Sequence, residues 1–303
     1  AAVALIVVGK FLLPVYLKQQ VFTMPQLLSQ RYDRSVSTLL AVLMLIMYVM
    51  VILPTILWLG AKAVNNLTGL ELIPAMILLG GLSLAYSLYG GLKAVALTDV
   101  IQVVLLIFGG LFVTYKGLDL LSEGNGLFEG FMILQSEFPE KFDAILSYAP
   151  KEVDPEAYAN YIKLPGIWVL IGGMWIAHFY YWGTNQYITQ RALGGKSLDE
   201  AQNGLMFAGF LKIFMPIVVV LPGLIAVALE ANGTINLAGD RSNAYPSMLN
   251  LLPEGIKGLT FAALVAAIVS SLASLSNSVS TIFTMDIYRK DQDIDDVSLV
   301  TVS

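Results

Sequence analysis

Five small residues near the end of the chain are spaced for one face of a helix. Ala267, Ser270, Ser271, Ser274 and Ser278 occupy positions i, i+3, i+4, i+7 and i+11 of an apolar segment. A hard cation requires several oxygen ligands at short range and no bulky neighbour. The stripe therefore indicates a cation site at membrane depth. Close packing of membrane helices through small residues is the alternative interpretation.

A second set of side chains is suited to holding a solute. His178, Tyr181, Trp182 and Asn185 are spaced i, i+3, i+4 and i+7, and Trp175 extends the same face by one turn. Flat aromatic faces suit the C–H groups of a polyol, while the imidazole and the amide suit its hydroxyl groups. The pattern favours the lining of a solute path over a simple packing seam.

Several charged residues lie within or beside apolar segments, where a charge is costly and suggests function. Lys212 lies about two turns inside its segment, so a site role and snorkelling toward the surface are both open. For Lys10, snorkelling or helix packing is the simpler interpretation. Asp99 follows the potential cap Thr98 and can complement a helix dipole or serve a cation. Two further acids, Glu230 and Asp286, fall at segment ends, where we expect them to be solvated.

The composition indicates a membrane protein. Hydrophobic residues make up 57% of the chain and charged residues 13%, and the mean hydropathy is +0.74, whereas a soluble domain carries about 25% charged residues. The chain has no cysteine and one histidine, which excludes a disulfide framework and the usual zinc clusters. The net charge is −5 without a basic patch, so nucleic acid is not an expected partner.

About 20 apolar residues cross the hydrocarbon core of a bilayer. By that criterion we expect seven spans, at residues 1–17, 38–61, 71–92, 96–115, 165–189, 204–229 and 257–285. Pro54, Pro216 and Pro222 lie within spans and free backbone carbonyls there. Broken helices of this kind are typical of secondary transporters.

Basic residues in the short connections give an orientation. Because long loops count little in the positive-inside rule, the acidic loop 116–163 is set aside, and the remaining count places residue 1 outside and residue 303 inside. The loop is then an external cap with short helices. The residues that define the inner side are Lys18, Arg31, Arg34, Lys93, Arg191, Lys196, Arg289 and Lys290.

The chain is expected to be a fragment of a longer membrane protein. It is apolar from its first residue, has no initiator methionine or signal peptide, and ends in a polar stretch, 291–303, that is typical of a connecting loop. We therefore interpret 1–303 as one transmembrane domain that continues beyond both ends.

Several long motifs together resemble the sodium/solute symporter family, and most closely its bacterial sodium/sugar branch. One of them is Tyr180-Tyr-Trp-Gly-Thr-Asn-Gln-Tyr-Ile-Thr-Gln-Arg191; the others lie at 11–18, 22–32, 86–95, 98–102, 266–274 and 283–288. The resemblance implies an all-α membrane protein with the leucine-transporter-type inverted repeat, two groups of five helices crossing the bilayer in opposite senses. This chain would hold core helices two to eight.

The resemblance also implies functional residues. In the family, a backbone carbonyl and two hydroxyls of core helix eight bind sodium, and these positions match Ala267, Ser270 and Ser271. Asp99 matches an acid near the sodium exit route. The remaining ligands of the family's sodium site come from core helix one, which would precede Ala1.

On the solute side, the family's aromatic inner gate matches Tyr181, which is followed by Trp182 as in relatives, and its sugar-contacting lysine matches Lys212. Where galactose-type relatives place an asparagine one turn before the gate, this chain has His178, which is larger and titrates near neutral pH. With Asn185 on the same predicted face, these side chains form the expected solute site.

We therefore expect a sodium-coupled symporter of the plasma (inner) membrane that imports a monosaccharide such as glucose or galactose, with Na+ as the co-transported ion and no enzyme activity. A symporter for a carboxylate, vitamin or amino acid is an alternative, as is a symporter-like sensor. A seven-helix receptor would leave the serine stripe and the motifs unexplained.

Overall fold

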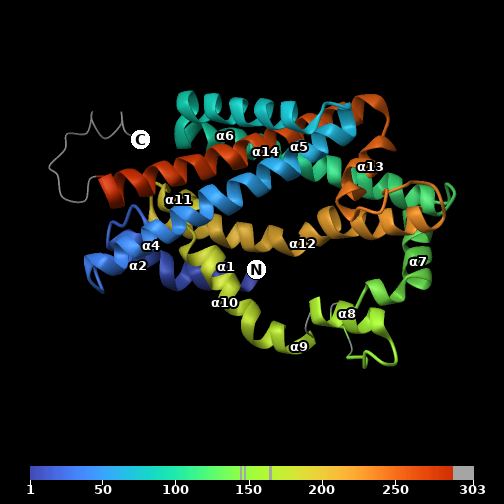
Figure 1. Cartoon of the computed structure of the whole chain (residues 1–303), viewed down its shortest axis with the longest axis horizontal. Helices are drawn as coiled ribbons and strands as arrows, with labels where there is room; N and C mark the ends of the chain where they lie inside the picture. Colours follow the sequence, from blue (N-terminus) through green and yellow to red (C-terminus); the bar gives the residue numbers. More distant parts are fainter. Residues whose placement is uncertain (144, 147, 164–165, 289–303) are drawn as a thin grey trace.

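The structure, a computed structural model, describes residues 1–143, 145–146, 148–163 and 166–288, with side chains for all but 90–95 and 156. Within these residues the regular structure is entirely helical (Figure 1). The elements in chain order are α1 (Ala2–Val7), η1 (Val8–Leu12), α2 (Leu13–Lys18), α3 (Met24–Ser29), α4 (Arg34–Met47), η2 (Tyr48–Ile52), α5 (Leu53–Thr68), α6 (Leu72–Leu121), α7 (Leu127–Glu137), η3 (Pro139–Lys141), α8 (Pro155–Lys163), α9 (Gly166–Trp168), η4 (Val169–Gly173), α10 (Met174–Phe179), η5 (Tyr180–Thr184), α11 (Gln186–Leu193), α12 (Leu198–Ala231), η6 (Arg241–Asn243), α13 (Ala244–Asn250), α14 (Glu254–Ile282) and η7 (Phe283–Tyr288).

Six helices in the described residues are long and apolar enough to cross a membrane: Arg34–Thr68, Leu72–Tyr89, Ala96–Leu121, Ala157–Thr184, Leu198–Ala231 and Glu254–Tyr288. They correspond to six of the seven predicted spans. The predicted first span, 1–17, is also helical, from Ala2 to Lys18, but falls short of the roughly 20 residues that cross the hydrocarbon core.

The predicted spans 71–92 and 96–115 are joined in a single element, α6, which doubles back on itself. The hydroxyl groups of Tyr86 and Thr98 are in hydrogen-bond contact, although twelve residues of straight helix would extend about 18 Å. The helix must therefore reverse direction between them, and Figure 1 shows the two arms of α6 running antiparallel. Both arms pack on α14: Ser87 of the first arm bonds Asn277 at 2.7 Å, and Gly109 of the second lies against Thr260.

Two spans contain a wide π turn just before a proline. The turn η1 precedes Pro14, and η2 precedes Pro54. Proline has no N–H and its ring displaces the carbonyl four residues earlier, so a wider turn relieves the clash. In α12, by contrast, Pro216 and Pro222 lie inside a continuous helix, which corrects the expectation of a break there. The Thr114 hydroxyl, which bonds the Gly110 carbonyl of its own helix at 2.9 Å, also lies 3.0 Å from the carbonyl oxygen of Ile217 and so links α6 to α12.

The long helices approach one another at small residues. A Cβ added to Gly60 would lie 2.6 Å from the Ile268 side chain, and one added to Gly109 would lie 2.5 Å from Thr260. Small residues permit this close approach of membrane helices. As a result α14 lies against α5 and both arms of α6, as Figure 1 shows, and its serine stripe faces protein.

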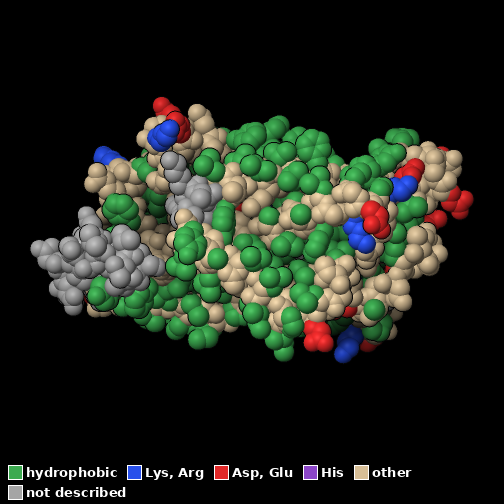
Figure 2. All heavy atoms as spheres, turned by 90° about the horizontal axis from the view of Figure 1, so that it is seen from above, with side chains coloured by type: hydrophobic (Ala, Val, Ile, Leu, Met, Phe, Trp, Pro, Cys, Tyr) green, Lys and Arg blue, Asp and Glu red, His purple; other side chains and the backbone are tan. Residues whose placement is uncertain are grey.

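The surface is divided between apolar and charged regions. On the face in Figure 2, a mainly hydrophobic band occupies the middle of the molecule. The predicted cap 116–163 contains short helices as expected, although α6 continues into it as far as Leu121. At the same end of the molecule, Lys62 of α5 pairs with Asp240 in the loop before α13. Arg289, Lys290 and the predicted tail 291–303 lie outside the described residues.

Candidate functional site

The serine stripe is confirmed as a feature of one helix, α14. Ser270 is 2% exposed and Ser274 and Ser278 are fully buried, while Ala267 and Ser271 are half-buried. The hydroxyl of Ser278 bonds within its own helix, to the carbonyl of Ser274 at 2.9 Å. The Ser271 hydroxyl makes no hydrogen bond within the described part of the chain. Its oxygen is therefore available to a ligand.

Asp99 is the centre of a polar network that joins three helices. Its Oδ1 accepts a hydrogen bond from Ser270, and its Oδ2 accepts one of 2.9 Å from Arg191 on α11. Arg191 also donates to the Ser274 hydroxyl at 2.7 Å and to the Tyr187 carbonyl at 3.2 Å. Both carboxylate oxygens are thus occupied. Asp99 lies within α6, in the first turn of the span Ala96–Leu121, close to the helix start predicted for it.

The second cluster contains three of the predicted solute residues. The ammonium group of Lys212 lies 5.0 Å from the centroid of the Trp182 ring, and the Trp182 ring meets Tyr181 edge-on at 4.9 Å. A cation over an aromatic face is electrostatically favourable, especially away from water. Lys212 therefore turns toward the protein and not simply toward the surface. Tyr181 is 41% exposed, and His178, on α10 one turn earlier, is half-buried.

Asn185 does not continue the face of His178 and Tyr181, so the prediction of one regular stripe is wrong. The π turn η5 changes the helical phase, and at Asn185 the backbone becomes extended, with φ −78° and ψ 114°. The Asn185 side chain is buried, accepts a 2.5 Å bond from the Tyr48 hydroxyl, and caps α11 by accepting from the Tyr187 N–H at 3.2 Å. Asn185 therefore fixes the break between η5 and α11.

The helix around Gly183 is held by a neighbouring π turn. The Tyr16 hydroxyl donates to the Gly183 carbonyl at 3.0 Å. A Cβ at Gly183 would lie 3.2 Å from both Leu12 and Val8 of η1. A side chain at Gly183 would therefore crowd Leu12 and Val8 of η1, and the buried tyrosine satisfies a carbonyl at the end of the helix.

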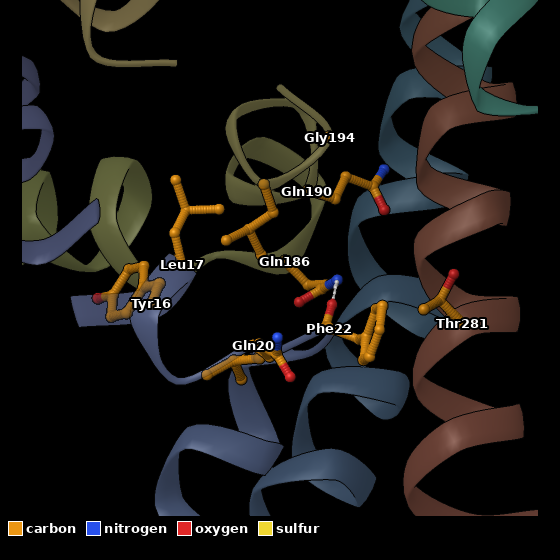
Figure 3. Close-up of a pocket in the computed structure, with 10 residues that line it drawn as sticks. Tyr16, Leu17, Gln20, Phe22, Gln186, Gln190, Gly194 and Thr281 are labelled. Carbon is orange, nitrogen blue, oxygen red and sulfur yellow. Dashed lines mark hydrogen bonds between the residues drawn. The ribbon is translucent and has the colours of Figure 1, made fainter. Parts of the chain in front are cut away.

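A cavity of about 570 Å³ lies beyond this break (Figure 3), beside and not at the predicted solute residues. Gln186 is fully buried, accepts from the Met24 N–H at 2.9 Å and donates to the Phe22 carbonyl at 3.0 Å. Gln190 donates to the Ser274 carbonyl at 3.1 Å, and Thr281 faces the cavity from α14. The short helix α11 therefore ties the α2–α3 loop to α14.

Sequence reasoning did not assign a role to these tying residues. Arg191, Gln186 and Gln190 lie within the Tyr180–Arg191 motif, and the two glutamines are spaced i and i+4, which was the available signal. Their partners, however, are distant in sequence and become visible only in the fold.

The comparisons with known proteins agree with this architecture. The sodium/glucose cotransporter of Vibrio parahaemolyticus is 42% identical over 96% of this chain and 54% of its own length. An uncharacterized symporter of Escherichia coli, YidK, is 35% identical over 100% of this chain and 52% of its own length. The human sodium/myo-inositol cotransporter 2 is 33% identical over 91% of this chain and 43% of its own length. The chain thus spans about half the length of these relatives.

A solved structure titled as a substrate-bound outward-open state of a Na+-coupled sialic acid symporter is similar over 99% of this chain and 62% of its own, with a TM-score of 0.82 and 22% sequence identity. That likeness confirms the predicted all-α membrane fold of the leucine-transporter type. The sequence model of the sodium:solute symporter family matches residues 1–294. The chain is a multi-pass membrane protein that belongs to the sodium:solute symporter family.

Proposed function

We propose that this chain is the central part, core helices two to eight, of a sodium-coupled symporter that imports a monosaccharide such as glucose or galactose by alternating access. The observation that carries the proposal is the arrangement of α14, where the unbonded Ser271 hydroxyl lies next to Ser270 and its partner Asp99. The similarity to a sodium/glucose cotransporter supports sugar as the solute. The protein moves its ligands without covalent chemistry, so we expect no enzyme activity.

Sodium is bound in this proposal by the carbonyl of Ala267 and the hydroxyls of Ser270 and Ser271, with further ligands from core helix one. Oxygen ligands of this kind suit a hard cation. Asp99 lies directly beside the site, bonded to Ser270 and to Arg191. A sodium ion leaving Ser270 would meet this carboxylate next, which supports its role on the exit route.

The solute site is formed by His178, Tyr181, Trp182 and Lys212. Lys212 holds its charge over the Trp182 ring, and Trp182 packs on Tyr181, so a solute that displaces Lys212 also acts on the gate residue. Tyr181 is the gate because it is exposed and borders the helix break that Asn185 fixes. Asn185 contributes to solute binding through this break, by positioning Tyr181.

Binding of both ligands favours the occluded form, and rocking of the repeats then opens the inner side. One positive charge that moves through 100 mV releases about 2.3 kcal/mol, whereas tenfold accumulation of a solute requires about 1.4 kcal/mol. The entry of one sodium ion therefore releases enough free energy for tenfold accumulation of the solute. We place the protein in the plasma (inner) membrane, and the basic residues in its short connections support an orientation with residue 1 outside.

The proposal is tested by uptake of labelled glucose and galactose into proteoliposomes that hold the complete transporter containing this chain, with an inward sodium gradient or with potassium instead. Sodium-dependent accumulation of either sugar is expected. If sodium drives uptake of an anionic solute and of neither sugar, the transported solute is a carboxylate, vitamin or amino acid instead. An intact protein that binds sodium and a solute but accumulates none would instead indicate a sensor.

Ser271→Ala tests the sodium ligands. Loss of one oxygen ligand is expected to raise the external sodium concentration for half-maximal uptake by about tenfold. Ser136→Ala is the matched control, because Ser136 is exposed on α7 and bonds only its own helix at 3.0 Å. Equal sodium affinity in the Ser271 and Ser136 variants would remove Ser271 from the site.

A further inference from the structure

The buried carboxylate of Asp286, in η7 directly after α14, is left incompletely bonded. Asp286 is only 8% exposed, although its position at a span end predicts solvation. Its Oδ1 accepts a 3.0 Å hydrogen bond from the Thr23 hydroxyl, whereas its buried Oδ2 has no hydrogen-bond partner in the described residues. A buried carboxylate oxygen without a donor is costly. The arrangement therefore suits a positively charged ligand.

Asp286 lines a small polar cavity of about 130 Å³, together with Ser29, Ser37, Thr38 and Gln26. The cavity is large enough for a few water-sized groups and too small for a sugar with its hydration. It is formed where the α3–α4 region meets η7, so residues distant in the sequence create it.

The hydroxyl groups around this cavity present oxygen lone pairs and not protons. Ser29 donates its proton to the Gln26 carbonyl at 2.8 Å, and Ser37 donates to the Pro25 carbonyl at 2.7 Å. A hydroxyl that has donated its single proton acts only as an acceptor toward other groups. Ser29 and Ser37 therefore offer acceptor oxygens beside Asp286, which a hard cation prefers, while Gln26 and Arg34 bring N–H donors to the same wall.

We propose that Asp286, with the hydroxyl oxygens of Ser29 and Ser37, forms a second, low-affinity sodium site at the end of α14. At 1.5 Å per residue, it lies about 22 Å along the helix from Ser271, on the side that the proposed orientation makes cytoplasmic. The site rests on the proposed function, in which sodium is released there. It would bind sodium that has left the Ser271 site, or sodium that returns from the cytoplasm.

Arg34 lowers the affinity of this site for sodium. It also lines the cavity, but its side chain is exposed, so water screens its charge. A guanidinium group at the mouth lowers the affinity for a cation without replacing it. Such a site releases sodium readily, as an exit site must.

Transport from the inner side tests the proposal. In proteoliposomes with the complete transporter, internal sodium inhibits uptake by occupying inward-facing sites. Asp286→Asn is expected to raise the internal sodium concentration for half-inhibition by about tenfold, while the external concentration for half-maximal uptake changes less than twofold. Arg34→Gln is expected to lower the internal value. Wild-type internal values in both variants would overturn the site.

A labelling experiment does not depend on transport. The chain has no cysteine, so Met285→Cys, in a background whose other cysteines are replaced, gives one thiol beside the cavity. Sodium, compared with potassium, is expected to slow its modification by a thiol reagent severalfold, and adding Asp286→Asn should abolish the effect. Exposed Ser136→Cys is the control. Protection of the thiol by sodium without sugar uptake would support this site and refute sugar symport. Sodium-driven sugar uptake without protection would support sugar symport and refute this site.

Discussion

The ion pair between Asp99 and Arg191 is expected to stabilise the fold, and a double-mutant cycle can measure its contribution. The single variants Asp99→Asn and Arg191→Gln remove one charge each; the first keeps the native shape, and the second also shortens the side chain. In the native chain the two side chains meet at 2.9 Å, with 24% of Asp99 and 33% of Arg191 exposed. The double variant removes both charges and so leaves neither unpaired.

The size of the effect follows from burial and from the bonds that are lost. A hydrogen bond to a charged group contributes about 1.5–3 kcal/mol, and breaking a fully buried pair costs about 3–5 kcal/mol. Because Arg191 is one-third exposed, water reduces these values. We therefore expect each single variant to lose about 2 kcal/mol of unfolding free energy, with a coupling energy of about 1–2 kcal/mol between the sites.

The assay is reversible unfolding of the detergent-solubilised complete protein by sodium dodecyl sulfate, followed by loss of helical circular dichroism. The control cycle is Lys116→Gln with Asp119→Asn, a pair at i and i+3 on one helix with a distance of 2.9 Å, for which about 0.3–0.5 kcal/mol is typical. A coupling for Asp99 and Arg191 no larger than this control would refute the reasoning.

Two further predictions concern packing and pH. Gly130→Ala should destabilise the protein by about 1–3 kcal/mol because the new Cβ would lie 2.1 Å from the backbone oxygen of Leu118, whereas Gly80→Ala, with open space, should be neutral or stabilising; equal thermal stability of the two variants would contradict this. The hydrogen bond from Lys62 lowers the pKa of Asp240 from its ordinary 3.8 to about 2. The stabilisation that Asp240→Asn removes should therefore be complete above about pH 4 and be lost as the pH falls through about 2; a stability difference between wild type and variant that is undiminished at pH 2 would count against the pair.

The serine stripe could be predicted because the helical period is constant across it. Ala267 to Ser278 lie in one uninterrupted α-helix, so spacing alone gives the shared face. The membrane spans were predictable for a related reason, since length and hydropathy decide whether a segment can cross a bilayer. The family resemblance added the identity of the fold, which periodicity does not give.

The remaining features depend on contacts between distant segments. Nothing local indicates that Asp99 meets Arg191 or that Asp286 is buried against Thr23, because these partners come together only after the helices pack. Asn185 was misplaced for a different reason. The π turn before it shifts the helical phase, so a count in steps of three and four no longer follows one face.

The π turns at η1, η2 and η5 have a consequence for comparing this chain with its relatives. Each such turn holds one residue more than the α-turn it replaces, so residues on the same face lie five and eight apart across it. An alignment with a relative that lacks the extra residue must place its gap in the middle of a helix. If the gap is moved to the nearest loop, every residue between that loop and the π turn is aligned with the wrong residue of the relative. Tyr181 and Trp182 are among the residues affected.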